Sequence, residues 1–435
     1  MLFRSEREIR ALRNAADGYL AAIEPQRAAD SSSPDFIGQL AQLGLAYQGL
    51  DRHQEAIAIF DEAVALTQRN GGEDNLEQIP LLEQKIPSYL ALDDFRAIDD
   101  TEDRIYELNA AFYGPTSRQM YNATINLADW QTAAYFLENY RQTGTKVFQR
   151  LRNVLSRPPR ALADTTGSSE SPIFNGAIKG INKQDIIDAR LRRIERLYVG
   201  YQDAIAKSGG AQLDIMIDIA KRIARLAFMT KQEMDFERDN YAYDPDYEGS
   251  LEQGARNSPD RRQESYDAGR LALDYLLNVL GSVEGVRPEA LAAAHLDMGD
   301  WHLAYGKLQA AEESYGEAYA VLLAAGFTSP NIDKALAMDM PPIVPLFATH
   351  LYSRASAGIA PNAELSFSGY VDIAYDVDAL GNPTELAFLA RSERDTSRIE
   401  AMIENQFKSL KFRPTLTGGE LSAPGRVQAR YYYSY

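Results

Sequence analysis

Two stretches of this chain, LGLAYQGLDRHQEAIAIFDEA at Leu43–Ala63 and MGDWHLAYGKLQAAEESYGEA at Met298–Ala318, share one arrangement of small and ring-bearing residues. In each, a glycine is followed by a ring 3 residues later and by a small–large–small series 12, 16 and 19 residues later. The first set is Gly44, Tyr47, Ala56, Phe60 and Ala63, and the second is Gly299, His302, Ala311, Tyr315 and Ala318. Small residues at this spacing let two helices cross closely, so each stretch predicts a helical hairpin.

The two stretches resemble the tetratricopeptide repeat. That resemblance implies hairpins stacked into an array, because one hairpin cannot cover its own apolar face. Helical spacing of apolar residues recurs through most of the chain before residue 340. The two clear stretches are not separated by a whole number of units of roughly 34 residues. We therefore predict an irregular tetratricopeptide-like α-solenoid over residues 1–337.

Two segments interrupt the helical pattern. Residues 156–183 and 239–262 are rich in residues that favour loops, and both insertions are predicted to be long loops that are either disordered or used for binding. Residues 338–345 include three prolines, which favour an extended and semi-rigid linker between two domains.

A different pattern begins after the linker. Residues 369–377 alternate apolar and polar side chains, which predicts a half-buried strand, and turn-forming residues follow at 378–382. A second alternating run, an amphipathic helix near 397–410 and a last alternating run at 427–435 come next. Pro414 and Gly418–Gly419 are expected to end the helix. Residues 346–435 are thus predicted to form a small β-α-β domain of the α+β class.

This order of elements resembles the C-terminal domain of the TonB energy-transducer family. The matching features are Gly369-x-Val371-x-Ile373-x-Tyr375-x-Val377-Asp378-x-x-Gly381, a helix ending at Phe407, Phe412-x-Pro414, and a last strand that ends in aromatic residues. The resemblance implies a periplasmic domain that pairs strands with proteins of the cell envelope.

Six residues are candidates for partner binding. By the geometry of the resembled repeat, Gln48 and Asp300 are expected to face the inner groove of the array. In the last strand the candidates are Arg426, Gln428, Arg430 and Tyr432. That strand could bind an extended peptide, pair with a second copy to form a homodimer, or be an internal strand of the sheet.

Composition argues against several classes of function. The formal net charge is −17, whereas a nucleic-acid-binding protein is expected to carry a basic face. The chain contains no cysteine, which excludes thiol catalysis, disulfides and thiolate metal sites. Its four histidines match no HExxH or triad spacing. We therefore predict no catalytic residue, no metal, no cofactor and no nucleic-acid partner.

The functional prediction is a non-catalytic scaffold or adaptor. It would bind envelope proteins in the periplasm, as an accessory to TonB-dependent outer-membrane transport and as a mature form after removal of a signal. No run of eighteen apolar residues is present, so no membrane span is expected. The alternatives left open are a cytoplasmic co-chaperone or regulatory scaffold of the tetratricopeptide type, and an enzyme of an unrecognised class.

Overall fold

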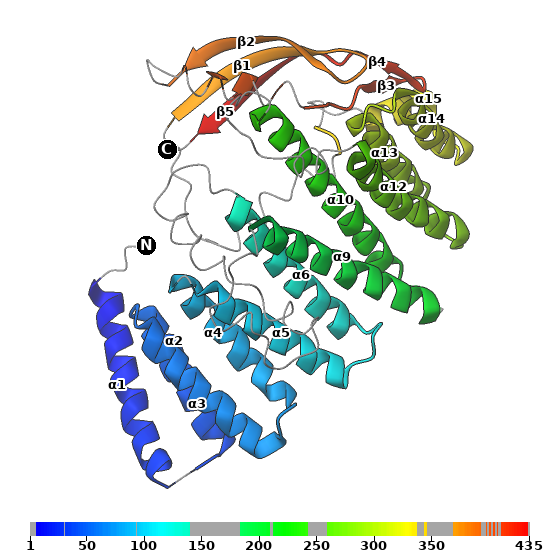
Figure 1. The fold of residues 1–435 in the computed structure, drawn as a ribbon. Coiled ribbons are helices and arrows are strands. Elements are labelled where there is room, and N and C mark those ends of the chain that lie inside the picture. The colour runs from blue at the N-terminus through cyan, green and yellow to red at the C-terminus, as the bar shows by residue number, and fades with distance from the viewer. Residues whose placement is uncertain are drawn as a thin grey trace. The chain divides into compact units, whose positions relative to one another are not determined.

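The computed structural model is mostly helical, with a small antiparallel sheet near its C-terminus (Figure 1). It describes residues 6–139, 183–208, 212–241, 259–336, 343–345 and 369–433, apart from short gaps at residues 30 and 93 and within 393–409. The predicted combination of a helical array with a small sheet-containing C-terminal region is present. Most of both predicted insertions, and most of the predicted linker, lie outside the described residues.

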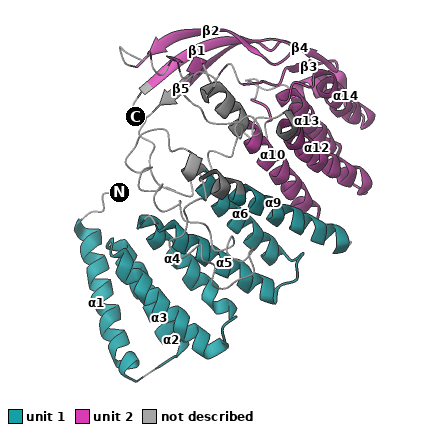
Figure 2. Cartoon of the chain, viewed as in Figure 1, with its two compact units in different colours: residues 1–210, 355–362 teal, residues 211–354, 363–435 magenta. Residues whose placement is uncertain are grey.

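The chain forms two compact units (Figure 2). Unit 1 contains residues 1–210 and 355–362, and unit 2 contains residues 211–354 and 363–435. This division falls at a different place from the boundary drawn from sequence pattern, because the last two helices before residue 337 pack with strands of the C-terminal region. The predicted division at 338–345 separates the helical part of the chain from the part that contains strands. The contacts between residues instead place the last helices and the strands in the same unit.

Unit 1 is a stack of helices. Its elements are α1 (Glu6–Ala28), α2 (Pro34–Gly49), α3 (His53–Gly71), the short 3-10 helix η1 (Leu76–Gln78), α4 (Ile79–Ala91), α5 (Phe95–Phe112), α6 (Arg118–Asn139) and α9 (Lys183–Ser208). Each helix packs against the one before it in this order. Ser33 begins α2 by accepting a hydrogen bond from the backbone N–H of Phe36, and Asp94 caps α5 in the same way at Ala97.

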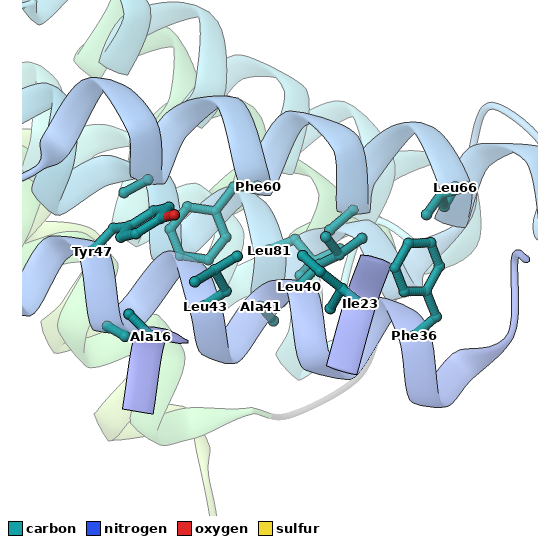
Figure 3. Packing of buried hydrophobic residues seen from close by; sticks show 13 residues of the cluster. Ala16, Ile23, Phe36, Leu40, Ala41, Leu43, Tyr47, Phe60, Leu66 and Leu81 are labelled. Atoms are coloured by element: carbon teal, nitrogen blue, oxygen red, sulfur yellow. The ribbon is translucent and has the colours of Figure 1, made fainter. Parts of the chain in front are cut away.

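The α2–α3 hairpin has the crossing that the sequence predicts. A Cβ atom at Gly44 would lie 2.6 Å from the Phe60 ring, so only glycine leaves room for that ring. Phe60, Ala56 and Ala63 of α3 are fully buried. Figure 3 shows Phe60 within the core. Ile23 of α1 joins the same core, which shows that α1 covers the outer side of the first hairpin.

Helices α5, α6 and α9 are joined by a buried polar network. Both terminal nitrogens of Arg190 donate to the Asp99 carboxylate at 3.0 Å, and Nη1 also donates to Oε1 of Gln131 at 2.7 Å. The indole of Trp130 donates to the same carboxylate at 2.7 Å. Arg190 and Asp99 are almost fully buried, so each needs the other to offset its loss of hydration.

Unit 2 combines helices and strands. Its elements are α10 (Leu213–Tyr241), α12 (Pro259–Ser282), α13 (Pro288–Ala304), α14 (Leu308–Ala324), α15 (Ser329–Leu336), β1 (Gly369–Val377), β2 (Pro383–Arg391), β3 (Thr415–Thr417), β4 (Glu420–Ser422) and β5 (Gly425–Tyr433). Residues 239–241 and 259–262 are therefore helical, although they were predicted to belong to an insertion. Residue 183, placed at the end of the other insertion, begins α9 of unit 1.

The α13–α14 hairpin repeats the crossing seen at Gly44. A Cβ atom at Gly299 would lie 2.5 Å from the ring of Tyr315. Ala311 and Ala318, on either side of Tyr315, are buried against α13. The same spacing of small and large residues thus produces the same close approach of two helices in both units.

The sheet has the strand order β2-β1-β5, and both pairings are antiparallel. Alternate residues of β1, from Val371 to Val377, are buried on one face. Phe407 and Phe412 pack on that face, with ring centroids 4.9 and 5.2 Å from the ring of Tyr375. Helical residues between 400 and 407 supply part of this layer. The C-terminal core of unit 2 is therefore formed by one face of the sheet and by the helical residues that pack on it.

The role predicted for Gly418 and Gly419 is wrong. They do not end the helix; they form the tight turn between β3 and β4, where both have positive φ angles of 62° and 90°. The backbone N–H of Gly418 donates to Asp333 of α15 at 3.0 Å, and Gly419 lies against the ring of Tyr319. A Gly-Gly pair between two runs is a hairpin signal, but two strands of three residues are too short to produce a clear alternating pattern beside it.

The crossing at Gly299 yields a matched test. Gly299→Ala should lower the free energy of unfolding by about 1–3 kcal/mol, because the added methyl group overlaps the Tyr315 ring. Gly316→Ala is the control in the same hairpin, since a Cβ atom there meets nothing within 4 Å. That control should be neutral or stabilising by up to about 1 kcal/mol, as alanine favours helix over glycine. Equal urea midpoints for the two variants would show that the hairpin is not packed in this way.

Candidate binding surfaces

The sheet of unit 2 has two edges that differ in regularity. Strand β2 forms one edge and β5 the other. The β1–β2 register shifts twice, β2 begins at Pro383, and Glu385 has a positive φ of 51°. Bulges and proline are the features by which edge strands avoid pairing with further strands. The β2 edge is thus protected against added strands.

The β5 edge carries none of these features among its described residues. Its nine residues pair one-to-one with β1, from Gly369 opposite Tyr433 to Val377 opposite Gly425. In the described part of the chain, no strand pairs with its outer side. A straight edge of this length is the feature that strand addition requires.

The hydrogen bonds of β1 show which groups of β5 point outward. Tyr370 accepts from the N–H of Ser392 at 3.0 Å and donates to its Oγ at 2.7 Å, so both backbone groups of Tyr370 face the β2 side. Because direction alternates along a strand, the even-numbered residues of β1 face β2 and the odd-numbered ones face β5. The β5 residues opposite the even-numbered set therefore turn their N–H and C=O away from β1. These are Arg426, Gln428, Arg430 and Tyr432.

Two of these four residues form ion pairs across the sheet. Arg430 donates to both oxygens of Asp372 at 2.7 and 3.0 Å and lies 3.9 Å from the centre of the Tyr370 ring. Hydrogen bonding to Arg430 holds the pKa of Asp372 below its usual value. Arg426 donates to Asp376 at 2.9 Å. Both arginine side chains are thus held on the exposed face, and the outer side of the strand is left to its backbone.

Gln428 and Tyr432 complete the predicted set in the last strand. Gln428 is exposed, between Val427, which is buried, and Ala429, which is partly buried. For Tyr432 the structure describes the backbone, which pairs with Tyr370. The sequence placed these residues on one strand, and the sheet order places that strand at an edge.

Gln48 does not project from the helical array into solvent. Its side-chain nitrogen donates to the carbonyl oxygen of Gln84 at 2.6 Å and to Oγ of Ser88 at 2.8 Å. Both acceptors belong to α4. Gln48 therefore joins α2 to the first helix of the next hairpin, which is a packing role.

Asp300 was predicted to face a groove, and the structure contradicts this. Its carboxylate is 0% exposed and accepts from Nε and Nη2 of Arg413 at 2.7 and 2.6 Å. The hydroxyl of Tyr315 donates to it at 2.9 Å. Burial and the nearby carboxylate raise the pKa of Tyr315 well above its usual value, so it stays a neutral donor. The Asp300 carboxylate is therefore bonded to Arg413 and Tyr315. The repeat template does not include Arg413, so it could not predict this contact.

Arg413 is the residue that sequence analysis missed. It stands between Phe412 and Pro414, which were singled out, and its side chain is 8% exposed. Burial by itself lowers the pKa of Arg413, but the contacts with Asp300 raise it to a net value above the ordinary one. An arginine directly after a buried aromatic residue was the available signal, but nothing in the sequence identified its partner.

The histidines form no site in the described residues. His302 is buried, and its Nδ1 lies 2.9 Å from the hydroxyl of Tyr266. Burial lowers the pKa values of His302 and His295, which favours their neutral forms near pH 7. No group of three or more metal-ligating side chains occurs in this part of the chain. A search of the helices described found none long and apolar enough to cross a membrane.

Comparison with known proteins finds matches among solved structures. No protein-family model matches the chain, and no curated protein matches its sequence. Among solved structures, BtubC (BKLC) from P. vanneervenii is 14% identical, with a TM-score of 0.31 over 74% of this chain and 93% of that protein. A Podosopora anserina putative kinesin light chain with nearly identical TPR-like repeats is 15% identical, with a TM-score of 0.26 over 49% of this chain and 88% of that protein. Scores this low do not establish a shared fold.

The Arg413–Asp300 pair predicts a large effect on stability. Arg413→Met should lower the free energy of unfolding of unit 2 by about 3–5 kcal/mol, because Asp300 is left buried and unpaired. The double variant Arg413→Met/Asp300→Leu should recover most of this loss, since no buried charge remains. Arg270→Met, which breaks a partly exposed pair with Asp274, is the control and should cost no more than about 1 kcal/mol. A midpoint for Arg413→Met equal to that of the control would show that the pair is not formed.

Proposed function

We propose that this chain is a non-catalytic, protein-binding scaffold that captures an extended peptide segment on the outer edge of β5. The observation that carries this proposal is the contrast between the two sheet edges. The β2 edge is interrupted by two register shifts and a proline, whereas β5 keeps nine residues in register. A regular edge offers repeated backbone hydrogen bonds to an added strand, and these supply affinity for many sequences.

Selectivity would come from the side chains that flank this edge. Arg426 and Arg430 are exposed, and each is paired with an aspartate of β1. An added strand would lie beside these ion pairs, so polar side chains on the peptide face that meets them would be favoured. Alternate peptide residues would meet the layer that contains Val427 and Ala429, where apolar side chains fit better.

The helical hairpins would serve as the body of the scaffold. Nearly all of the net charge of −17 lies before residue 354. A partner of the helical region is therefore expected to be basic or polar, and its association rate is expected to fall as salt rises. Neither catalysis nor a cofactor is part of this proposal.

The cell compartment forms a further part of the proposal. The TonB-like order of elements in residues 369–435 supports a periplasmic adaptor that binds envelope proteins as an accessory to TonB-dependent outer-membrane transport. A second copy of the chain is another candidate partner, because one β5 edge could pair with another to give a homodimer. Cell fractionation of the native protein tests the location. Recovery in the cytoplasmic fraction would leave the scaffold proposal intact and remove the envelope partners.

The strand-addition proposal is tested by removing one backbone donor. Gln428→Pro removes an N–H that points away from β1, so the sheet should stay folded while partner binding weakens by at least about tenfold. Gln428→Ala is the control, because it changes the same side chain and keeps the N–H. Its binding should stay within about threefold of the unchanged protein.

Partners for this test come from cross-linking in native cells followed by mass spectrometry, and self-association is followed by analytical ultracentrifugation. Circular dichroism and urea unfolding show whether each variant is folded. Ala429→Pro should instead disrupt the sheet, since the N–H of Ala429 points towards β1. If Gln428→Pro folds and keeps all of its partner binding and self-association, strand addition at β5 is excluded.

A further inference from the structure

Unit 1 contains a pocket that no sequence motif predicted. It has a volume of about 320 Å³ and lies where α5, α6 and α9 pack together. Figure 1 shows these three helices side by side. This volume is at the small end of the range of about 300–1,000 Å³ that is typical of ligand sites. A single small group, such as one amino-acid side chain with its terminal carboxylate, is the size of ligand that fits.

One face of α9 gives the pocket two chemically different ends. Arg193, Arg196, Gly200 and Ala204 recur at helical spacing, so they line one wall in this order. The two arginines lie at the N-terminal end of that row, and the small residues lie at the C-terminal end. The pocket is therefore cationic at one end and apolar at the other.

At the cationic end, one guanidinium nitrogen of Arg193 and the side chain of Arg196 have no carboxylate partner among the described residues. Arg193 pairs through Nη2 with Asp103, but its buried Nη1 has no hydrogen-bond acceptor among the described residues. Burial raises the pKa of Asp103, and Arg193 only partly opposes that rise. Arg196 donates through Nε to the carbonyl oxygen of Arg192 at 3.2 Å. Within the described ranges, no carboxylate pairs with Arg196.

The apolar end is lined by the ring of Tyr201, whose polar atom is already used. The hydroxyl of Tyr201 donates to the carbonyl oxygen of Ser117 at 3.0 Å, so the ring serves as a wall. Met120 lies beside it and is buried. A Cβ atom built at Gly200 meets nothing within 4 Å, which shows that open space lies over this part of α9.

We propose that this pocket binds a carboxylate carried on one aromatic or branched aliphatic group. The carboxylate would accept two hydrogen bonds from the guanidinium of Arg196, near the Nη1 of Arg193 that has no acceptor among the described residues, and the apolar group would lie over Gly200 against Tyr201. A planar carboxylate fits a single guanidinium in this way, whereas a bare phosphate would leave the apolar end unfilled. The ligand is either a free organic acid or the C-terminal residue of a peptide. This site is independent of strand addition at β5.

Isothermal titration calorimetry with the full-length protein tests the chemistry of the ligand. The probes are 3-phenylpropionate, its uncharged amide, and the tripeptide Gly-Gly-Phe with a free or an amidated C-terminus. Each acid should bind at least about tenfold more tightly than its amide, because the charged hydrogen bonds to arginine are lost in the amide. Equal affinity of the two acids would identify a free organic acid as the ligand, and tighter binding of the free tripeptide would identify a peptide terminus.

Two pairs of variants locate the binding. Arg196→Met should weaken binding of 3-phenylpropionate by at least about tenfold, while Arg192→Met should leave it unchanged, because both arginines are exposed on the same helix but only Arg196 lines the pocket. Gly200→Leu should fill the pocket and abolish binding, while Gly18→Leu, at an exposed and open helical position in α1, should not. Both glycine variants should fold, because leucine favours helix over glycine.

Three results would overturn this assignment. The first is equal binding of each acid and its amide, or binding of neither. The second is undiminished binding by Gly200→Leu or by Arg196→Met. The third is complete displacement of 3-phenylpropionate by an equal concentration of inorganic phosphate, which would identify an unselective anion site.

Discussion

The contact between Arg413 and Asp300 is the constraint on which unit 2 depends. Both groups are removed from water, and a buried charge without a partner costs several kcal/mol, so the segment around Arg413 must meet α13 wherever the chain folds correctly. The two residues lie 113 positions apart, which makes this pair a link between the helical hairpin and the segment that follows the sheet-covering helix. Arg190 and Asp99 have the same role in unit 1, across three helices. Each unit therefore contains a buried arginine–aspartate pair whose two members must meet when that unit folds.

The two sites proposed to bind partners lie where the packed helices and strands leave an unpaired strand edge and an unfilled pocket. In the sheet, β1 is paired on both sides, and irregularity protects one outer strand while regularity leaves the other open. In unit 1, the packing of α5, α6 and α9 leaves a pocket over Gly200 of α9. Both proposed binding sites use hydrogen-bonding groups that lack a partner within the described residues. At β5 these are backbone donors and acceptors, and at the pocket they are guanidinium N–H groups.

Local patterns were reliable where a short spacing encodes a local contact. The glycine–aromatic spacing that predicted the hairpins depends on two helices joined by a tight turn, so the contacts of Gly44 with Phe60 and of Gly299 with Tyr315 are visible in the sequence. The alternation of β1 was equally clear. Errors came where a residue of ordinary local pattern has a distant partner. Asp300 occupies a groove position in the repeat template, yet its neighbour in space is an arginine from the far end of the unit.

The sequence by itself determined the helical periods, the two close helix crossings, the strand alternation near the C-terminus and the lack of thiol chemistry, because each depends on residues within one or two turns or on composition alone. Tertiary structure decided which strand became a free edge, which charges were buried together, that Gly418 and Gly419 turn a hairpin, and where the pocket lies. These features depend on which distant segments meet. That choice is made by the total free energy of burial and charge pairing, and no single stretch of residues records it.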